Sequence, residues 1–177
     1  MDATAFPSGE PAPRRGTYEL TTRVWLPQPV DEVFPFFADA HNLNLLTPAF
    51  LHFEILTPRP IAMREGLLLD YRIRLRGLPI RWKTRIRSWE PGRRFVDEQV
   101  RGPYLEWVHT HEFVPVDGGT DVLDTVRYRV LGGALVNALI VERDVRGIFE
   151  YRLDALRRHF GAQPSATDQL ARVRRLR

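Results

Sequence analysis

The chain has 177 residues, of which 44% are hydrophobic and 27% are charged, and it carries a net charge of +4. A chain of this length and composition can bury a sizeable core as one domain, so global disorder is excluded. The absence of cysteine excludes disulfides, thiolate metal sites and a cysteine nucleophile. A reducing, cytoplasmic location is therefore expected, and neither a secretory signal nor a membrane-spanning apolar run is recognisable.

The first part of the chain predicts one strand followed by two short helices. Residues 1–16, rich in Pro, Ala and Gly, are expected to form a flexible leader. Alternating apolar side chains predict a strand over 18–26, and prolines separate it from short helices over 30–39 and 40–47. The second helix could close a cavity or belong to an ordinary core, through Leu43, Leu45, Leu46 and Phe50.

A series of strands joined by turns follows. One strand is predicted over 51–57, and the clearest two-residue alternation in the sequence covers 67–75 and 80–87. Further turns that bound the later strands are predicted at Pro91-Gly92, Gly102-Pro103 and Asp117-Gly118.

The last long element is an amphipathic helix over 134–160, which ends at Gly161. Residues 162–177 are predicted to be a basic tail with no partner in the chain. One helix covers only one face of an antiparallel sheet, so the sheet must curl around it. The predicted fold is α+β: a curved antiparallel sheet of about seven strands around one long C-terminal helix, in a domain of residues 17–161. The apolar face of the helix is expected to contain Leu135, Leu139, Val145, Ile148, Phe149, Leu153, Leu156 and Phe160.

The inner face of this sheet would carry an unusual number of polar side chains. Trp107, His109, His111 and Phe113 share one face of a strand, and the aromatic residues mark that face as covered. An unpaired polar group costs roughly a few kcal/mol to bury, so a solid core has no use for this set. We therefore expect a ligand-holding cavity of roughly several hundred Å³. The same parity places on the neighbouring strands Phe95, Asp97, Gln99, Val122, Asp124, Val126 and Tyr128.

A turn at Asp117-Gly118 would set the pairing of two of these strands. This dipeptide favours a two-residue type I′ hairpin, which places His111 opposite Asp124. An aspartate across from a histidine fixes its tautomer and can raise its pKa. The pair is either a general base or ligand anchor, or a structural pair beneath the helix.

The order of elements and one stretch of sequence resemble a known superfamily. The run F-V-D-E-Q-V-R-G-P-Y-L-E-W-V-H-T-H-E-F, then G-T-D-V-L-D-T-V-R-Y and I-F-E-Y-R, is similar to bacterial ligand-binding members of the START and birch-pollen-allergen superfamily (SRPBCC). The resemblance covers roughly residues 17–160 and includes relatives of oligoketide cyclases. It implies a helix-grip fold whose interior holds an apolar small molecule, and a minority of members catalyse reactions there.

The combined interpretation is a protein that binds a small hydrophobic molecule for transport, sequestration or sensing. The alternative is a polyketide cyclase- or dehydratase-like enzyme with His111 and Asp124 as the candidate catalytic pair. No cofactor is expected. The predicted ligand-binding residues are Tyr71, Trp82, Phe95, Asp97, Gln99, Trp107, His109, His111, Phe113, Asp124, Val126, Tyr128 and Ile148.

Two further hypotheses concern a metal and an anionic partner. His109 and His111, with Asp97 or Asp124, have the spacing of an open zinc site, but no other spacing supports one, so no metal is predicted. A basic outer face either contacts an anionic membrane or acidic partner, or is simply solvated; nucleic acid is not expected, because no aromatic residues are interleaved. This face would consist of Arg72, Arg74, Arg76, Arg81, Lys83, Arg85 and Arg87.

Overall fold

The computed structural model describes residues 12–176, so most of the predicted leader lies outside the described residues. Within them, eight strands form one sheet in the order β2-β3-β4-β5-β6-β7-β1-β8, and every neighbouring pair is antiparallel. The strands are β1 (Tyr18–Leu26), β2 (Glu54–Ile55), β3 (Leu68–Leu75), β4 (Leu78–Glu90), β5 (Arg94–Arg101), β6 (Glu106–Val116), β7 (Gly119–Arg129) and β8 (Gln169–Arg175).

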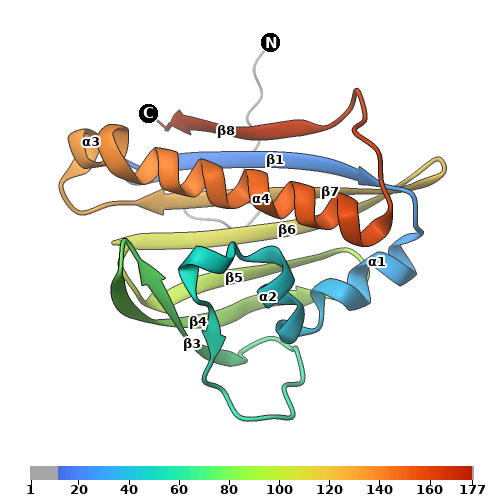
Figure 1. The fold of residues 1–177 in the computed structure, drawn as a ribbon, viewed down its shortest axis with the longest axis horizontal. Helices are drawn as coiled ribbons and strands as arrows, with labels where there is room; N and C mark the ends of the chain where they lie inside the picture. Colours follow the sequence, from blue (N-terminus) through green and yellow to red (C-terminus); the bar gives the residue numbers. More distant parts are fainter. Residues whose placement is uncertain (1–11, 177) are drawn as a thin grey trace.

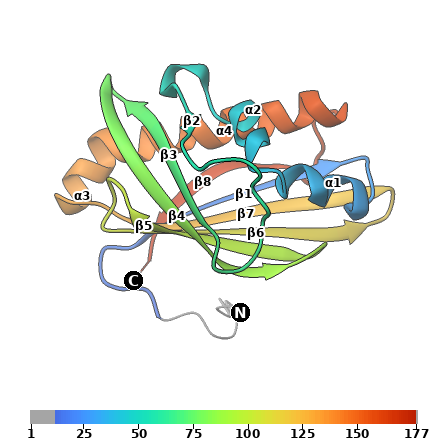
Figure 2. The same cartoon turned by 90° about the horizontal axis from the view of Figure 1, so that it is seen from below.

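The helices all lie on one face of this sheet, which curls around the longest of them (Figures 1 and 2). α4 runs along β1 and β7, whereas the short helices α1 and α2 lie at the other side of the same face. The predicted α+β helix-grip class is therefore confirmed. The helical segments are α1 (Val30–Phe37), η1 (Ala40–Asn42), α2 (Leu43–Leu46), η2 (Ala49–Leu51), α3 (Gly133–Val136), η3 (Asn137–Val141) and α4 (Glu142–Phe160).

The C-terminal segment differs from the prediction of a tail without a partner. Residues of β8 pair with β1, in register from Tyr18 opposite Arg175 to Arg23 opposite Gln169. Ala171 is buried in the core, whereas Arg174 on the opposite face contacts Glu19 of β1. The single apolar residues in this basic stretch are too few for a visible alternation, so the unpaired edge of β1 decides its conformation.

The predicted strand over 51–57 is also wrong in most of its length. The 3₁₀ turn η2 takes its first residue, and His52 follows with a left-handed φ of 44°. Only Glu54–Ile55 of this stretch forms a strand, β2, which pairs with β3.

The predicted long C-terminal helix is continuous over 133–160 but contains a π-helical turn, which corrects part of its predicted apolar face. η3 is a π-helical turn, in which each turn contains more residues than an α turn, so the apolar stripe of α4 does not continue through it. Leu135 and Leu139 are consequently 70% and 68% exposed, and Asn137 is buried instead. Among the described helices, none is both long and apolar enough to cross a bilayer.

The β6–β7 register agrees with the prediction from the turn. Val116 pairs with Gly119 across Asp117-Gly118, and His111 pairs with Asp124. Gly118 has a φ of 73°, a conformation that favours glycine, but Asp117 does not have a positive φ, so the turn is not the predicted type I′, which needs positive φ at both central residues.

A polar layer divides the interior between sheet and helices. One apolar cluster contains Phe34, Phe113 and Leu156, and the other contains Leu20, Val126 and Phe149. Between them lie the buried side chains of His109, His111, Asp124 and Arg152.

Candidate functional site

A cavity of about 200 Å³ lies between the helices and the part of the sheet formed by β3, β4, β5 and β6. This volume is below the ~300–1,000 Å³ typical of small-molecule pockets, and also below the several hundred Å³ expected from the sequence. The strands β3 to β6 line the cavity on one side and α4 lines it on another, and the segment from α1 to η2 forms a further wall. Apolar side chains dominate the wall, among them Leu69, Ile73, Ile86, Val145 and Phe149.

The predicted ligand-binding residues separate into two groups. Those on β3 to β6, together with one residue of α4, line the cavity: Tyr71, Trp82, Phe95, Asp97, Trp107, His109, His111 and Ile148. Their side chains alternate inward as the two-residue period predicts.

The remaining five predicted residues do not line the cavity. Gln99 holds the β5–β6 connection through hydrogen bonds with backbone atoms of Tyr104, at 2.8 and 3.3 Å. Phe113 packs in one apolar cluster, while Val126 and Tyr128 pack in the other, all fully buried. Asp124 is also buried, behind the two histidines.

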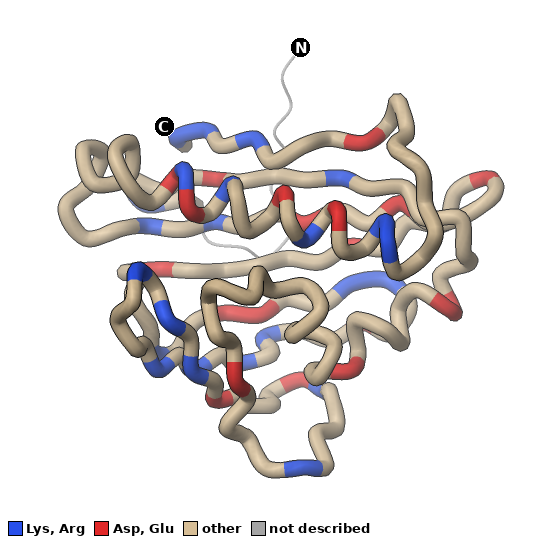
Figure 3. The backbone as a smooth tube through the Cα atoms, viewed as in Figure 1, with Lys and Arg blue, Asp and Glu red and all other residues tan. Residues whose placement is uncertain are grey.

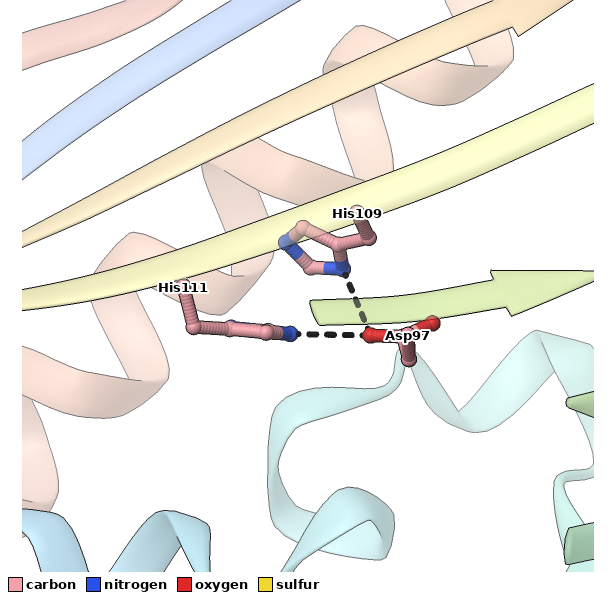
Figure 4. Close-up of side chains that lie close together, drawn as sticks. All are labelled: Asp97, His109 and His111. Carbon is pink, nitrogen blue, oxygen red and sulfur yellow. Dashed lines mark hydrogen bonds and ion pairs between the residues drawn. The ribbon is translucent and has the colours of Figure 1, made fainter. Parts of the chain in front are cut away.

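The polar corner of the cavity is a ring of two carboxylates and two imidazoles. Nε2 of His109 and Nδ1 of His111 lie 3.0 and 2.8 Å from Oδ1 of Asp124. Nε2 of His111 lies 3.0 Å from Oδ2 of Asp97, and Nδ1 of His109 lies 3.7 Å from the same oxygen (Figure 4). Each imidazole therefore bridges both carboxylates.

Backbone pairing brings these residues together from three neighbouring strands. Asp97 of β5 pairs with His109, and Asp124 of β7 pairs with His111, so β6 stands between the two aspartates. Phe95 stacks on the His111 ring, with centroids 4.1 Å apart and an interplanar angle of 20°. The backbone register of β5, β6 and β7 and the side-chain hydrogen bonds thus hold both histidines in place, and the ring of Phe95 also packs on His111.

Arg152 of α4 completes the cluster, and the sequence analysis missed it. Its Nε donates to Oδ2 of Asp124 at 2.9 Å, and its side chain is only 7% exposed. The signal that could have revealed it is its position, three residues after Phe149 and four before Leu156, on the buried stripe of the helix. A guanidinium on that stripe requires a buried anion, since an unpaired charge is costly to bury.

For Asp124, His109 and His111, burial and the nearby opposite charges shift the pKa in opposite directions. Burial acts to raise the pKa of Asp124, but Arg152 and both histidines outweigh it and hold that pKa well below its ordinary value. Burial lowers the pKa of His109, helped by His111, and the aspartates offset this only in part. For His111 burial also acts to lower the pKa, but Asp124 and Asp97 prevail and raise it. His111 therefore accepts a proton before His109 does.

The structure shows whether the segment of α2 and η2 covers the cavity or belongs to an ordinary core. Leu43, Leu46 and Leu51 line the cavity, so this segment forms one of its walls. Leu46 is also part of an apolar cluster, while Leu45 and Phe50 point outward, 52% and 68% exposed. The segment is both wall and core.

Lys and Arg positions recur along the hairpin of β3 and β4, with acidic positions near them (Figure 3), and their side chains are exposed or half-buried. Lys83 and Asp70 form an ion pair of 3.1 Å, and Arg85 is paired with Glu98. Arg76, at the turn of the hairpin, reaches Asp144 of α4 at 3.0 Å. These pairs reduce the net charge of the face, which weakens the case for an anionic partner.

A curved antiparallel sheet closed over a long C-terminal helix, with a mostly apolar cavity between them, defines a helix-grip protein. The sequence profile of the family described as polyketide cyclase / dehydrase and lipid transport matches residues 17–161. The chain therefore belongs to this family, and the superfamily resemblance of the sequence is confirmed. Among curated proteins, none is significantly similar to this chain in sequence.

Solved structures share the fold at low sequence identity. Protein CV1439 from Chromobacterium violaceum superimposes with a TM-score of 0.64 at 16% identity, over 82% of this chain and 98% of its own. Protein Ms6760 from Mycobacterium smegmatis gives 0.60 at 15%, over 81% and 90%. Ara h 8.0201 gives 0.59 at 15%, over 82% and 98%. At these identities the likeness concerns the fold alone.

Proposed function

We propose that the protein binds a small hydrophobic molecule with one polar end in the cavity between α4 and the β3–β6 part of the sheet. The cavity wall supports this: it is aromatic and aliphatic apart from a charged corner formed by Asp97, His109, His111 and Arg152. Burial stabilises the apolar body of such a ligand, and the corner orients its polar group.

The family description names two ligand classes, lipids and polyketides. Both combine a large apolar surface with a few oxygens, which matches the composition of the wall. A cavity of about 200 Å³ favours the smaller members of either class. Transport, sequestration and sensing all require only this binding step.

Native mass spectrometry of freshly purified protein tests the proposal directly, because a retained molecule would appear as an added mass. A panel of medium-chain fatty acids, naphthoquinones and aromatic polyketides should then be titrated by calorimetry. Ile148→Trp fills part of the cavity and is expected to weaken binding at least tenfold, or about 1.4 kcal/mol.

Ile140→Trp is the matched control, since Ile140 lies in η3, is 38% exposed and does not line the cavity. It should leave affinity unchanged. Equal affinity of both variants for every bound compound would place the binding site elsewhere.

A second candidate is a cyclase- or dehydratase-like activity in the same cavity. One observation favours it: the His111 ring lines the cavity and is held between two carboxylates. His111→Gln should then keep ligand affinity within about tenfold yet abolish turnover, because an amide cannot accept and return a proton. Wild-type protein that binds its ligand without converting it would leave binding as the function.

A further inference from the structure

The two histidines of the polar corner each direct one ring nitrogen at Asp124 and the other at Asp97. On the inner side, His109 Nε2 and His111 Nδ1 both face Oδ1 of Asp124, at 3.0 and 2.8 Å. On the cavity side, His109 Nδ1 and His111 Nε2 both face Oδ2 of Asp97 (Figure 4). Asp97 is the more accessible of the two carboxylates, with 17% of its side chain exposed against 2% for Asp124.

We propose that Asp97, His109 and His111 form a binding site for a divalent transition-metal ion. One ligand atom from each residue lies within 4.8 Å of the other two. In a tetrahedral zinc site with bonds of about 2.0–2.2 Å, neighbouring ligand atoms are about 3.3–3.6 Å apart. The Asp97 oxygen already lies 3.0 and 3.7 Å from the two nitrogens, which is close to that spacing.

The surroundings of the three residues match those of a metal site. A histidine that binds a metal usually donates the N–H of its other ring nitrogen to a carboxylate, which fixes its orientation and tautomer. Here one carboxylate, that of Asp124, is in place to accept from both rings; Nη2 of Arg152 lies near the same nitrogen of His111, at 3.3 Å against 2.8 Å for the carboxylate oxygen. Arg152 binds the second oxygen of that carboxylate at 2.9 Å and so holds it in position.

The charges and lone pairs of the polar corner also favour a bound cation. When His109 donates from Nε2 to Asp124, its Nδ1 carries a lone pair that faces the Asp97 carboxylate oxygen. Two acceptors directed at the same space repel each other unless a proton or a metal cation lies between them. With both imidazoles neutral, as metal ligands must be, two carboxylates and a single guanidinium leave the corner net negative, and a bound cation reduces this charge.

The ligand types select the class of ion. Two imidazoles and one carboxylate suit Zn²⁺ or Fe²⁺, whereas Mg²⁺ and Ca²⁺ prefer oxygen ligands throughout. Three protein ligands leave coordination positions open, and these face the cavity. A carboxylate or enolate oxygen of a bound molecule could occupy one; this last step rests on the proposed function, whereas the metal site does not.

Metal uptake can be measured without any organic ligand. Protein stripped with a chelator and dialysed should bind one Zn²⁺ per chain in competition with a chromophoric chelator. Substitution by Co²⁺ should give the visible absorption of a low-symmetry site with nitrogen and oxygen ligands. Asp97→Asn and His109→Gln should each weaken Zn²⁺ binding at least tenfold, because each removes a ligand, whereas excess Mg²⁺ should not compete.

His41→Gln provides the matched control. Nδ1 of His41 lies 2.8 Å from Oδ1 of Asp39 in an exposed pair, so it offers the same two residue types outside the corner. It should retain the wild-type affinity for Zn²⁺. Wild-type protein that takes up no more Zn²⁺ than Asp97→Asn, or a site that is lost in His41→Gln, would overturn the proposal.

Folding defects do not obscure the result. The Co²⁺ spectrum of the wild type requires no variant, and Asp97, at the edge of the cavity, tolerates an isosteric amide better than the fully buried groups do. Ile148→Trp separates this proposal from the previous one: it should impair binding of the organic ligand and leave Zn²⁺ uptake intact.

Discussion

The two halves of the sheet present similar inner faces but are covered differently. Over β7, β1 and β8, the helix α4 packs directly on the strands, and Leu20, Val126 and Leu153 are at most 1% exposed. Over β3, β4 and β5, aromatic and aliphatic side chains of the same alternation face a cavity. β6 is the border, with Phe113 in the core and the two histidines at the cavity. The side-chain pattern of a strand thus specifies an inner face, while the position of the helix decides whether that face is packed or hollow.

The largest expected effect lies at the border, where the packed half supplies a charge to the polar corner. Arg152→Met leaves Asp124 buried without its guanidinium and should lower the free energy of unfolding by about 3–5 kcal/mol. Urea denaturation followed by circular dichroism measures this. The control Arg158→Met, an exposed position on the same helix, should change stability by less than about 0.5 kcal/mol. A loss of similar size in both variants would contradict the view that Arg152 acts through Asp124.

Matched leucines compare the two halves directly. Leu20→Ala opens a void in the packed half and should cost about 3–4 kcal/mol, whereas Leu69→Ala, beside an existing cavity, should cost about 2 kcal/mol. Leu69 already lacks packing partners on its cavity side, so fewer contacts are lost. Chemical denaturation of both variants tests this ordering. If Leu69→Ala were the more destabilising change, the hollow half would be as tightly packed as the other.

The contribution of Asp168, beside β8 at the outer edge of the packed half, to the free energy of unfolding should depend on pH. Asp168 accepts from the backbone N–H of Trp25 and Ser165 and from Arg157. Burial acts to raise its pKa, but these hydrogen bonds prevail and lower it from 3.8.

Folding therefore favours the ionised carboxylate of Asp168, so its contribution is complete above pH 3.8 and is lost as the pH falls through the lowered value. Asp168→Asn should cost about 1.5 kcal/mol at pH 6. The difference in unfolding free energy between wild type and variant should shrink toward pH 3. A difference that is constant over this range would mean that the charge of Asp168 does not contribute.

The smallest effect concerns Gln99, which the sequence analysis placed in the ligand-binding site and which the structure places outside the cavity wall. Gln99→Ala removes two hydrogen bonds to the backbone of Tyr104 and should cost about 1 kcal/mol of stability. Ligand affinity, measured by calorimetry, should change less than twofold, because Gln99 does not line the cavity. A tenfold loss of affinity without loss of stability would return Gln99 to the binding site.

Several features of the fold could be predicted because they depend on short-range patterns. Two-residue alternation determined which side chains of β3, β4 and β6 point inward, and Asp117-Gly118 determined the register that joins His111 to Asp124. The order of strands and helices, together with the need to cover one sheet face, was enough for the helix-grip class. The same order of elements indicated the superfamily, and the stretch of residues 95–113 pointed to a narrower group within it.

Tertiary structure decided the rest, because the deciding contacts join residues far apart in the chain. β8 forms because the edge of β1 offers unpaired backbone groups, and no local pattern in Gln169–Arg175 predicts this strand. Arg152 is part of the polar corner because α4 crosses the sheet where Asp124 lies. The path of that helix also leaves a cavity, rather than direct packing, between it and β3 to β5. The sequence by itself thus determined which side chains face inward, and three-dimensional packing decided which of them meet a cavity and which meet a core.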